Sequence, residues 1–415
     1  MKYKKLFFLF ILTIQFLIGC SSQKFNSENY TGKWKAEITM PGGSLPFDFV
    51  INKKGNGLSS SILNGEEKVN IKEVKSENDS LTLFLPAYNT KIRLKKDVKL
   101  KKLSGTLTLI KSGGIKQIMN VRAVKLKDEN KTYKFSVNVS GRWQVNFVDD
   151  EGNKTISVGE FTQNNSKVIG TFLTTTGDYR YLNGFVKSND LQLSTFDGAH
   201  VFLFKAKLKK DGKLYGDFWS GTQWHENWTG VRNEKAALPD EDSLTFLKKG
   251  HNRISFSLED IYGNKVSLSD KKFKGKVVLV NLAGSWCPNC NDEARYLSEY
   301  YKKKKNKGLE IISLMFENYK DKNKNIRQIK RFRDKFDIKY DLLYAGINNK
   351  GVAAKLLPML NTVLAFPTTI FIGRNGEVRK ITTGFSGPGT GKHYIKFLEK
   401  FDLFVNHLLN EKIKK

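Results

Sequence analysis

Two cysteines three positions apart, Cys287 and Cys290, stand in the motif Trp-Cys-Pro-Asn-Cys at residues 286–290. An apolar run at residues 277–282 predicts a buried strand before the motif, and residues 292–305 predict a helix after it. At such a junction both sulfurs lie at the helix N-terminus, where unpaired N–H groups and the helix dipole favour a thiolate. We therefore predict a redox-active pair that alternates between dithiol and disulfide.

Metal binding and a purely structural disulfide are the alternatives for this pair. The chain has three cysteines and five histidines. A structural zinc site needs four ligands, and neither a second cysteine pair nor a ligand-like histidine spacing is present. A disulfide that closes so short a loop removes little chain entropy and so stabilises little. We expect no metal and no cofactor beyond the disulfide itself.

The N-terminus predicts export. After a cationic start, residues 6–18 form an apolar segment too short to span a bilayer. The sequence Leu-Ile-Gly-Cys at residues 17–20 resembles a bacterial lipobox, which implies a lipoprotein signal peptide at residues 1–19, a lipid on Cys20 and a polar tether at residues 20–30. An ordinary secretory peptide and a transmembrane anchor are the alternatives. Each places the body of the protein outside the cytoplasm, where disulfides form. We expect a lipoprotein anchored to the membrane of the cell envelope, facing the periplasm or the exterior.

Charge and length set further limits. The chain has 415 residues, of which 39% are hydrophobic, and a formal net charge of +30. Nucleic acid and anionic lipid are the usual partners of so basic a chain. Lysine is scattered over every segment and no nucleic-acid motif is present, so we expect no nucleic-acid partner. The basic stretch at residues 320–335 is a solvated helix face, a docking surface or a contact to lipid headgroups.

The first half of the chain predicts an all-β region with an internal duplication. Short alternating runs separated by turn residues argue antiparallel strands closed as a barrel or folded as a sandwich. Gly-x-Trp at residues 32–34 recurs at residues 141–143, a period of about 110 residues that allows roughly eight strands per copy. We place the copies at residues 31–125 and 126–232. The Gly-x-Trp opening resembles that of lipocalin-like barrels, and we carry no lipid-binding function over from it.

A polar, proline-containing linker at residues 233–249 separates the β-rich region from residues 250–412. Strands and helices alternate there and end in a hairpin, which predicts a mixed sheet between helices. The linker predicts that the two parts fold separately. Beyond the first helix, the patterns predict strands at residues 309–316, 339–344, 368–372 and 378–383 and helices at residues 324–336, 352–360 and 392–409.

Residues 250–412 resemble the thioredoxin-fold domain of membrane-tethered thiol–disulfide reductases, the TlpA/ResA-like family. The motif at residues 286–290 matches the family's active site. Phe-Pro-Thr-Thr at residues 366–369 matches the loop whose proline is cis and lies against the cysteines. A hairpin at residues 258–276 matches the N-terminal extension, and Glu293 matches the acid beside the site.

The residue types and the resemblance together imply a mechanism. Cys287, at the helix start, attacks a substrate disulfide, and Cys290 resolves the mixed disulfide. Glu293 lies one turn beyond Cys290 and is suited to take or return its proton. The alternative is a solvated acid, or a first-turn helix acid stabilised by the helix dipole. Asn281 occupies the place of the buried acid in the central strand of thioredoxin, so the proton must go to Glu293 or water.

The resemblance also implies a substrate groove and partners. Trp286, Pro288, Phe366 and Pro367 line the groove that receives substrate. Disulfide-containing envelope proteins or apocytochromes are the expected substrates, and a membrane electron donor supplies the reducing equivalents.

Two alternatives come from other functional classes. A peroxiredoxin-type peroxidase shares the N-terminal extension but needs a threonine three residues before its cysteine, where this chain has Gly284. A binding lipoprotein would use its β-rich region to capture a ligand or partner, with the redox domain as an accessory.

Overall fold

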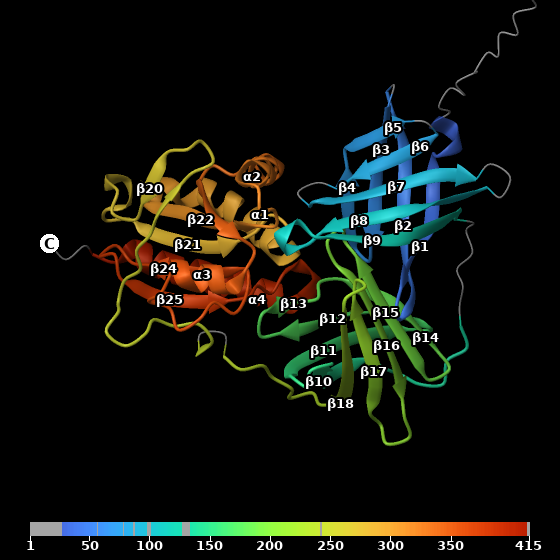
Figure 1. The fold of residues 1–415 in the computed structure, drawn as a ribbon. Coiled ribbons are helices and arrows are strands. Elements are labelled where there is room, and N and C mark those ends of the chain that lie inside the picture. The colour runs from blue at the N-terminus through green and yellow to red at the C-terminus, as the bar shows by residue number, and fades with distance from the viewer. Residues whose placement is uncertain are drawn as a thin grey trace, which may run out of the picture.

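The computed structural model describes residues 27–55, 57–77, 79–85, 88–97, 101–126, 133–240 and 243–412. Two β-barrels lie on one side of the molecule and an α/β domain on the other (Figure 1). The predicted signal peptide and Cys20 lie outside the described residues. No helix in the described part of the chain is long and apolar enough to cross a membrane.

The first barrel is an antiparallel meander. Its nine-stranded sheet begins at β4 and ends at β5, which are separated by the single residue Lys72, so that the bent segment joins both edges. If β4 and β5 are counted as one bent strand, the barrel has eight strands, as predicted. The strands are β1 (Gly32–Met40), β2 (Gly43–Lys54), β3 (Gly57–Asn64), β4 (Glu67–Ile71), β5 (Glu73–Glu77), β6 (Ser80–Phe84), β7 (Thr90–Asp97), β8 (Lys102–Ile110) and β9 (Lys116–Lys125).

The second barrel repeats this order and closes through hydrogen bonds between β11 and β12. Its two-residue β13 is an added hairpin strand that matters for the active site below. The strands are β10 (Gly141–Asp149), β11 (Lys154–Asn164), β12 (Lys167–Thr174), β13 (Gly177–Asp178), β14 (Leu182–Lys187), β15 (Asp190–Phe196), β16 (Val201–Leu208), β17 (Leu214–Ser220) and β18 (Trp224–Arg232).

The recurring tryptophans anchor the two barrels in the same way. Trp34 and Trp143 are both fully buried. Each indole N–H donates to the carbonyl four residues earlier, Tyr30 at 2.8 Å and Val139 at 2.9 Å. A cation from the last strand of each unit lies over each ring, Lys125 in the first and Arg232 in the second. This shared geometry supports the predicted duplication.

Side chains fill the interior of the second barrel. Phe147, Phe172, Phe204 and Phe218 contact one another there, with ring centroids 5.4 Å apart for Phe147 and Phe172 and 4.3 Å for Phe204 and Phe218. Strands with alternating burial therefore enclose a packed core.

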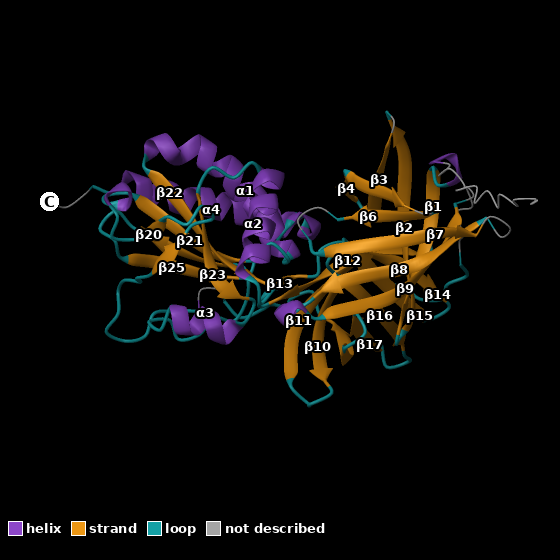
Figure 2. Ribbon diagram, turned by 45° about the horizontal axis from the view of Figure 1, so that its top comes forward, coloured by secondary structure: helices purple, strands orange, loops and turns teal. Residues whose placement is uncertain are grey.

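The α/β domain has the predicted thioredoxin-like architecture, with helices on both faces of a five-stranded sheet of order β23-β22-β21-β24-β25 (Figure 2). Its elements are β19 (Ser257–Glu259), β20 (Lys265–Ser267), β21 (Val277–Ala283), α1 (Pro288–Lys304), β22 (Leu309–Glu317), α2 (Lys322–Phe336), β23 (Asp341–Ile347), α3 (Lys350–Leu356), β24 (Thr368–Ile372), β25 (Val378–Thr383) and α4 (Lys392–Asn410). Short 3₁₀ helices lie at Ser27–Asn29, Ser112–Gly114, Lys271–Phe273, Lys305–Lys307 and Pro388–Thr390.

Two predicted helix boundaries are wrong by four residues, and the other helix boundaries differ by two residues or fewer. Helix α1 begins at Pro288, four residues earlier than predicted, because the cysteine motif itself forms the first turn. Helix α3 ends at Leu356 instead of near residue 360, because Pro358 has no N–H to continue the ladder.

The β-rich region and the α/β domain pack against each other, and their separate folding stays a prediction. Ser112 of the first barrel donates to the Asn348 carbonyl at 2.6 Å, and Asn318 donates to the Ile110 carbonyl at 2.8 Å. Buried contacts from the second barrel reach α1, as described below. The linker composition gave no sign of them, because they join residues more than one hundred positions apart.

We predict that Trp34→Ala and Trp143→Ala each lower the free energy of unfolding of the β-rich region by about 3–5 kcal/mol, since each empties a large buried site. Denaturant unfolding followed by circular dichroism measures this. Trp224→Ala is the matched control, because Trp224 is 49% exposed, and it should change stability by less than about 0.5 kcal/mol. Equal effects of the three substitutions would contradict the anchoring role.

Candidate active site

The cysteine pair lies where β21 turns into α1. All seven residues of β21, the central strand of the sheet, are buried, which fixes the point where the turn begins. Cys287 is the N-cap of α1, and the backbone N–H of Cys290 donates to Cys287 Sγ at 3.2 Å. The two sulfurs form a disulfide. Cys287 is 5% exposed and Cys290 1%, so Cys287 is the more accessible of the two, although both are buried.

The predicted proline loop lies against this pair. The Phe366–Pro367 bond is cis, as predicted, and the Phe366 carbonyl oxygen lies 3.3 Å from Cys287 Sγ. The rings of Trp286 and Phe366 meet edge to face, 6.1 Å apart, and the Trp286 indole donates to the Phe316 carbonyl at 2.8 Å. Trp286 and Phe366 are half-buried.

The two prolines predicted for the groove, Pro288 and Pro367, are both buried. The structure therefore brings the predicted groove residues together at the sulfurs, but it leaves little of the motif accessible.

Glu293 is buried, which excludes the solvated-acid alternative. Its carboxylate accepts hydrogen bonds from the Asn281 side chain at 2.6 Å and from Thr369 Oγ1 at 2.8 Å. Burial raises its pKa to about 7, although these two hydrogen bonds favour the charged form. A carboxyl group that titrates near neutrality one turn after Cys290 is suited to exchange a proton with that thiol.

A second buried acid, Glu317, supports the turn before the cysteines. Its carboxylate accepts from the Ser285 N–H at 2.8 Å and from Ser285 Oγ at 2.7 Å. Burial raises the pKa of Glu317 to about 7. The sequence analysis missed this residue; the available signal was an acid at the end of the apolar run that forms β22.

The second barrel contributes an unexpected part of the site. Asn289 of the motif donates to the Asp178 carbonyl oxygen at 3.2 Å. The Asp178 carboxylate accepts from the backbone N–H groups of Gly387 at 2.7 Å and Arg180 at 2.6 Å. Burial raises the pKa of Asp178 to about 6. The hairpin around β13 therefore lies directly on the first turn of α1.

Arg180 joins three parts of the chain in what we name the Arg180 cluster. Its guanidinium donates to both carboxylate oxygens of Asp292 in α1, at 2.9 and 3.1 Å. It also donates to Asp197 of the second barrel at 2.6 Å and to Glu67 of the first barrel at 2.7 Å. The side chain of Arg180 is 3% exposed and that of Asp292 1%. Sequence patterns could not pair these residues, which are distant in the chain.

Gly284 is a close-approach position that argues against the peroxidase alternative. A Cβ added at Gly284 would collide with Trp286 Nε1 and would lie 2.6 Å from the Phe316 carbonyl oxygen. The threonine that a peroxidase needs at this place therefore does not fit.

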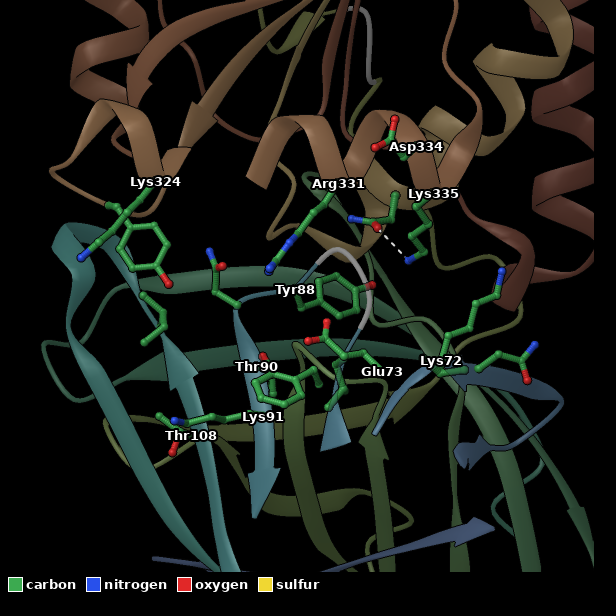
Figure 3. A pocket seen from close by; sticks show the side chains of 18 of the residues that line it. Lys72, Glu73, Tyr88, Thr90, Lys91, Thr108, Lys324, Arg331, Asp334 and Lys335 are labelled. Carbon is green, nitrogen blue, oxygen red and sulfur yellow. Dashed lines mark hydrogen bonds between the residues drawn. The ribbon is translucent and has the colours of Figure 1, made fainter. Parts of the chain in front are cut away.

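A cleft of about 1200 Å³ separates α2 from the first barrel (Figure 3). Arg331 and Lys335 project from the helix, and Tyr88 and Lys91 line the opposite side. Arg180 and Asp292 are also among its lining residues, so the Arg180 cluster borders this space. Within the described ranges, no group of three or more metal-ligating side chains is present.

Comparisons with known proteins concern the C-terminal part of the chain. Residues 250–381 match the AhpC/TSA family. The thiol-disulfide oxidoreductase ResA of Bacillus thuringiensis is 31% identical over 150 residues, which cover 36% of this chain and 78% of that protein. ResA of Bacillus subtilis is 31% identical over 140 residues, covering 33% of this chain and 69% of that protein. The thioredoxin domain of a thiol-disulfide oxidoreductase from Bacteroides vulgatus is 24% identical, covers 38% of this chain and 99% of that structure, and has a TM-score of 0.29.

Fold, cysteine pair and cis-proline loop define a thioredoxin-fold protein-disulfide oxidoreductase. Through its C-terminal domain, the chain belongs to the ResA-like thiol–disulfide oxidoreductases.

We predict that Cys290→Ser accumulates mixed disulfides between Cys287 and substrate, whereas Cys287→Ser does not. The reason is position: Cys287 is the more accessible sulfur and receives the N–H of residue 290. Non-reducing electrophoresis and mass spectrometry of the trapped species measure this. Trapping by the Cys287 variant alone would reverse the two roles.

We predict that Glu293→Gln slows turnover by about a hundredfold and stabilises the protein at alkaline pH. The folded-state pKa of about 7 lies above the ordinary 4.5. The wild type therefore loses stability as pH rises from about 4.5 to 7, and the glutamine variant escapes this loss. The gain is about 3 kcal/mol at pH 8 and near zero at pH 4.

Rate assays and denaturant unfolding at the two pH values check both parts of this prediction. Glu299→Gln is the matched control, because Glu299 is an exposed acid on the same helix. A glutamine variant at residue 293 that is slow but less stable at pH 8 would indicate structural damage instead of a lost proton-transfer group.

Proposed function

We propose that this protein reduces disulfides in proteins of the cell envelope, with Cys287 as nucleophile, Cys290 as resolving thiol and Glu293 as proton acceptor and donor. The observation that carries the proposal is Glu293: a buried carboxyl with a pKa of about 7, one turn after the less accessible cysteine. The membership in the ResA-like oxidoreductases supports the same chemistry.

The proposed reaction has two displacement steps. The Cys287 thiolate attacks one substrate sulfur, the substrate S–S bond breaks, and the departing thiolate takes a proton from solvent. Cys290 then loses its proton to Glu293 and attacks Cys287 Sγ, which breaks the bond to substrate and leaves the Cys287–Cys290 disulfide. The departing substrate thiolate takes a proton from Glu293. Two electrons pass from the protein to the substrate, so a dithiol electron donor at the membrane must restore the reduced pair.

The groove residues fit this proposal. Trp286 and Phe366 offer half-buried aromatic surface beside Cys287. Pro367 has no N–H, which keeps a backbone donor away from the sulfur. Disulfide-bonded envelope proteins or apocytochromes are the proposed substrates. The packed interior of the second barrel does not favour a binding lipoprotein as the main function.

We further propose that a lipid on Cys20 anchors the protein to the membrane of the cell envelope, with the redox domain facing the periplasm or exterior. Two or more acyl chains would give stable anchoring, whereas one would not. We predict a mature chain that begins at an acylated Cys20. Mass spectrometry of the mature N-terminus measures this, and an unmodified terminus at another residue would refute the lipid anchor.

Catalysed reduction of oxidised glutathione, with dithiothreitol as the electron source, tests the enzymatic proposal. The wild type should accelerate the reaction and Cys287→Ser should not. Equilibration against glutathione then gives the direction. A reduction potential more negative than that of the glutathione couple supports a reductase, and a more positive one would make the protein an oxidase.

A further inference from the structure

We propose that residues 175–181 of the second barrel, which we name the wall loop, form one wall of the active-site groove and select substrates by width. Arg180 is the positioning residue that holds the wall loop in place. Narrow disulfides reach Cys287 with the loop in its observed position, and bulky ones require the loop to move. The inference rests on the proposed disulfide chemistry and adds a substrate class to it.

The wall loop touches both borders of the groove. On one side, Asn289, two residues after the nucleophilic cysteine, donates to the Asp178 carbonyl oxygen. On the other side, the loop meets Gly384, whose N–H donates to the Pro367 carbonyl at 2.9 Å. The cysteine turn and the cis-proline loop are thus connected to the same short segment of the barrel.

Glycines make this contact possible. A Cβ at Gly384 would lie 2.7 Å from the backbone nitrogen of Gly177, and a Cβ at Gly177 would collide with Asn289. A Cβ at Gly389 would lie 2.8 Å from the carbonyl carbon of Arg180. The two backbones approach so closely that no side chain fits between them, which distinguishes a built contact from a chance encounter of two surfaces.

The Arg180 cluster fixes the loop in this position. Arg180 has φ +55°, the left-handed region that a long side chain adopts only when its surroundings enforce it. Those surroundings are the carboxylates of Asp292, Asp197 and Glu67. A charge on the active-site helix and charges on both barrels therefore hold one strained residue next to the groove.

The surroundings leave the loop room to move. The cleft of about 1200 Å³ borders the Arg180 cluster, with Arg331 and Lys335 on one side and Tyr88 on the other (Figure 3). Beside Arg180, open space therefore separates the first barrel from α2. Loss of the ion pairs with Asp292 would remove the charged tie between the loop and α1 and leave two hydrogen bonds, from Asn289 and from the Gly387 N–H to Asp178, to hold it.

The loop covers Asn289 of the motif, which contacts Asp178 and lies against Gly177. Cys287 is 5% exposed and Asn289 8% exposed. If the observed position dominates in solution, the affinity for a bulky substrate falls in proportion to the fraction of molecules in which the loop has moved away. A narrow substrate that enters beside the loop escapes this reduction.

The test compares kcat/KM on oxidised glutathione, a narrow disulfide, with kcat/KM on insulin, a bulky one. Two full-length variants release the loop from opposite sides. Arg180→Met removes its ion pairs with α1, and Gly389→Ala inserts a methyl group from the redox domain against the backbone of Arg180. Gly389 does not have a positive φ, so alanine is not strained there. Arg232→Met, in the same barrel but over Trp143, is the control.

Both releasing variants should raise kcat/KM on insulin by about tenfold and leave kcat/KM on glutathione within about twofold. A merely structural lesion would lower both values, so a selective gain cannot arise from misfolding. An insulin-to-glutathione ratio equal to that of the wild type and of the Arg232 variant would overturn the wall role. If Arg180→Met does not fold, or if the two variants give different results, the insulin-to-glutathione ratio of Gly389→Ala decides whether the wall role holds. Absence of wild-type activity on both substrates would overturn the proposed function instead.

Discussion

One buried guanidinium contacts all three parts of this protein. Arg180 contacts Asp292 in the redox domain, Asp197 in its own barrel and Glu67 in the first barrel. Breaking a buried ion pair costs about 3–5 kcal/mol, because the remaining partner is left as an uncompensated charge. Loss of Arg180 would therefore leave all three carboxylates of the cluster without this partner. Its arrangement sets where the barrels stand relative to the active-site helix.

The Arg180 cluster contains three carboxylates and one guanidinium, and neighbouring groups compensate part of the excess negative charge. Burial alone would raise the pKa of Asp197, but His200 and Arg180 hold it below its usual range. Burial raises the pKa of Glu67, and its attraction to Arg180 offsets only part of this effect. Arg295 adds a second cation to Asp292 at 3.0 Å. The two most buried carboxylates, Asp197 and Asp292, therefore each have a second cationic partner besides Arg180, in His200 and Arg295.

Sequence patterns predicted those features that depend on residues close together in the chain or on a repeat. The strand-to-helix junction, the cis-proline loop and the two tryptophan-anchored barrels each follow from residues close together in sequence or from a repeat. The helix boundary at Pro358 was missed although its signal was local. Arg180, Asp178 and Asn289 could not be assigned, because their roles depend on how separate domains pack. The sequence Gly-Asp-Tyr-Arg at residues 177–180 has no period or motif that indicates an active-site contact.

The environment of Glu293 shows how a buried carboxyl group is held beside the central strand although Asn281 stands where thioredoxin has an acid. The Asn281 amide donates to both Glu293 and Thr369, and Thr369 donates to Glu293 in turn. The strand thus supplies hydrogen-bond donors where thioredoxin has an acid, and the carboxyl group comes from the helix. A carboxylate in this position remains buried and near neutrality in pKa, which is the property that proton transfer to a buried thiol requires. Helix α1 carries both Cys290 and Glu293, so the helix backbone itself fixes this carboxyl group one turn beyond the second cysteine.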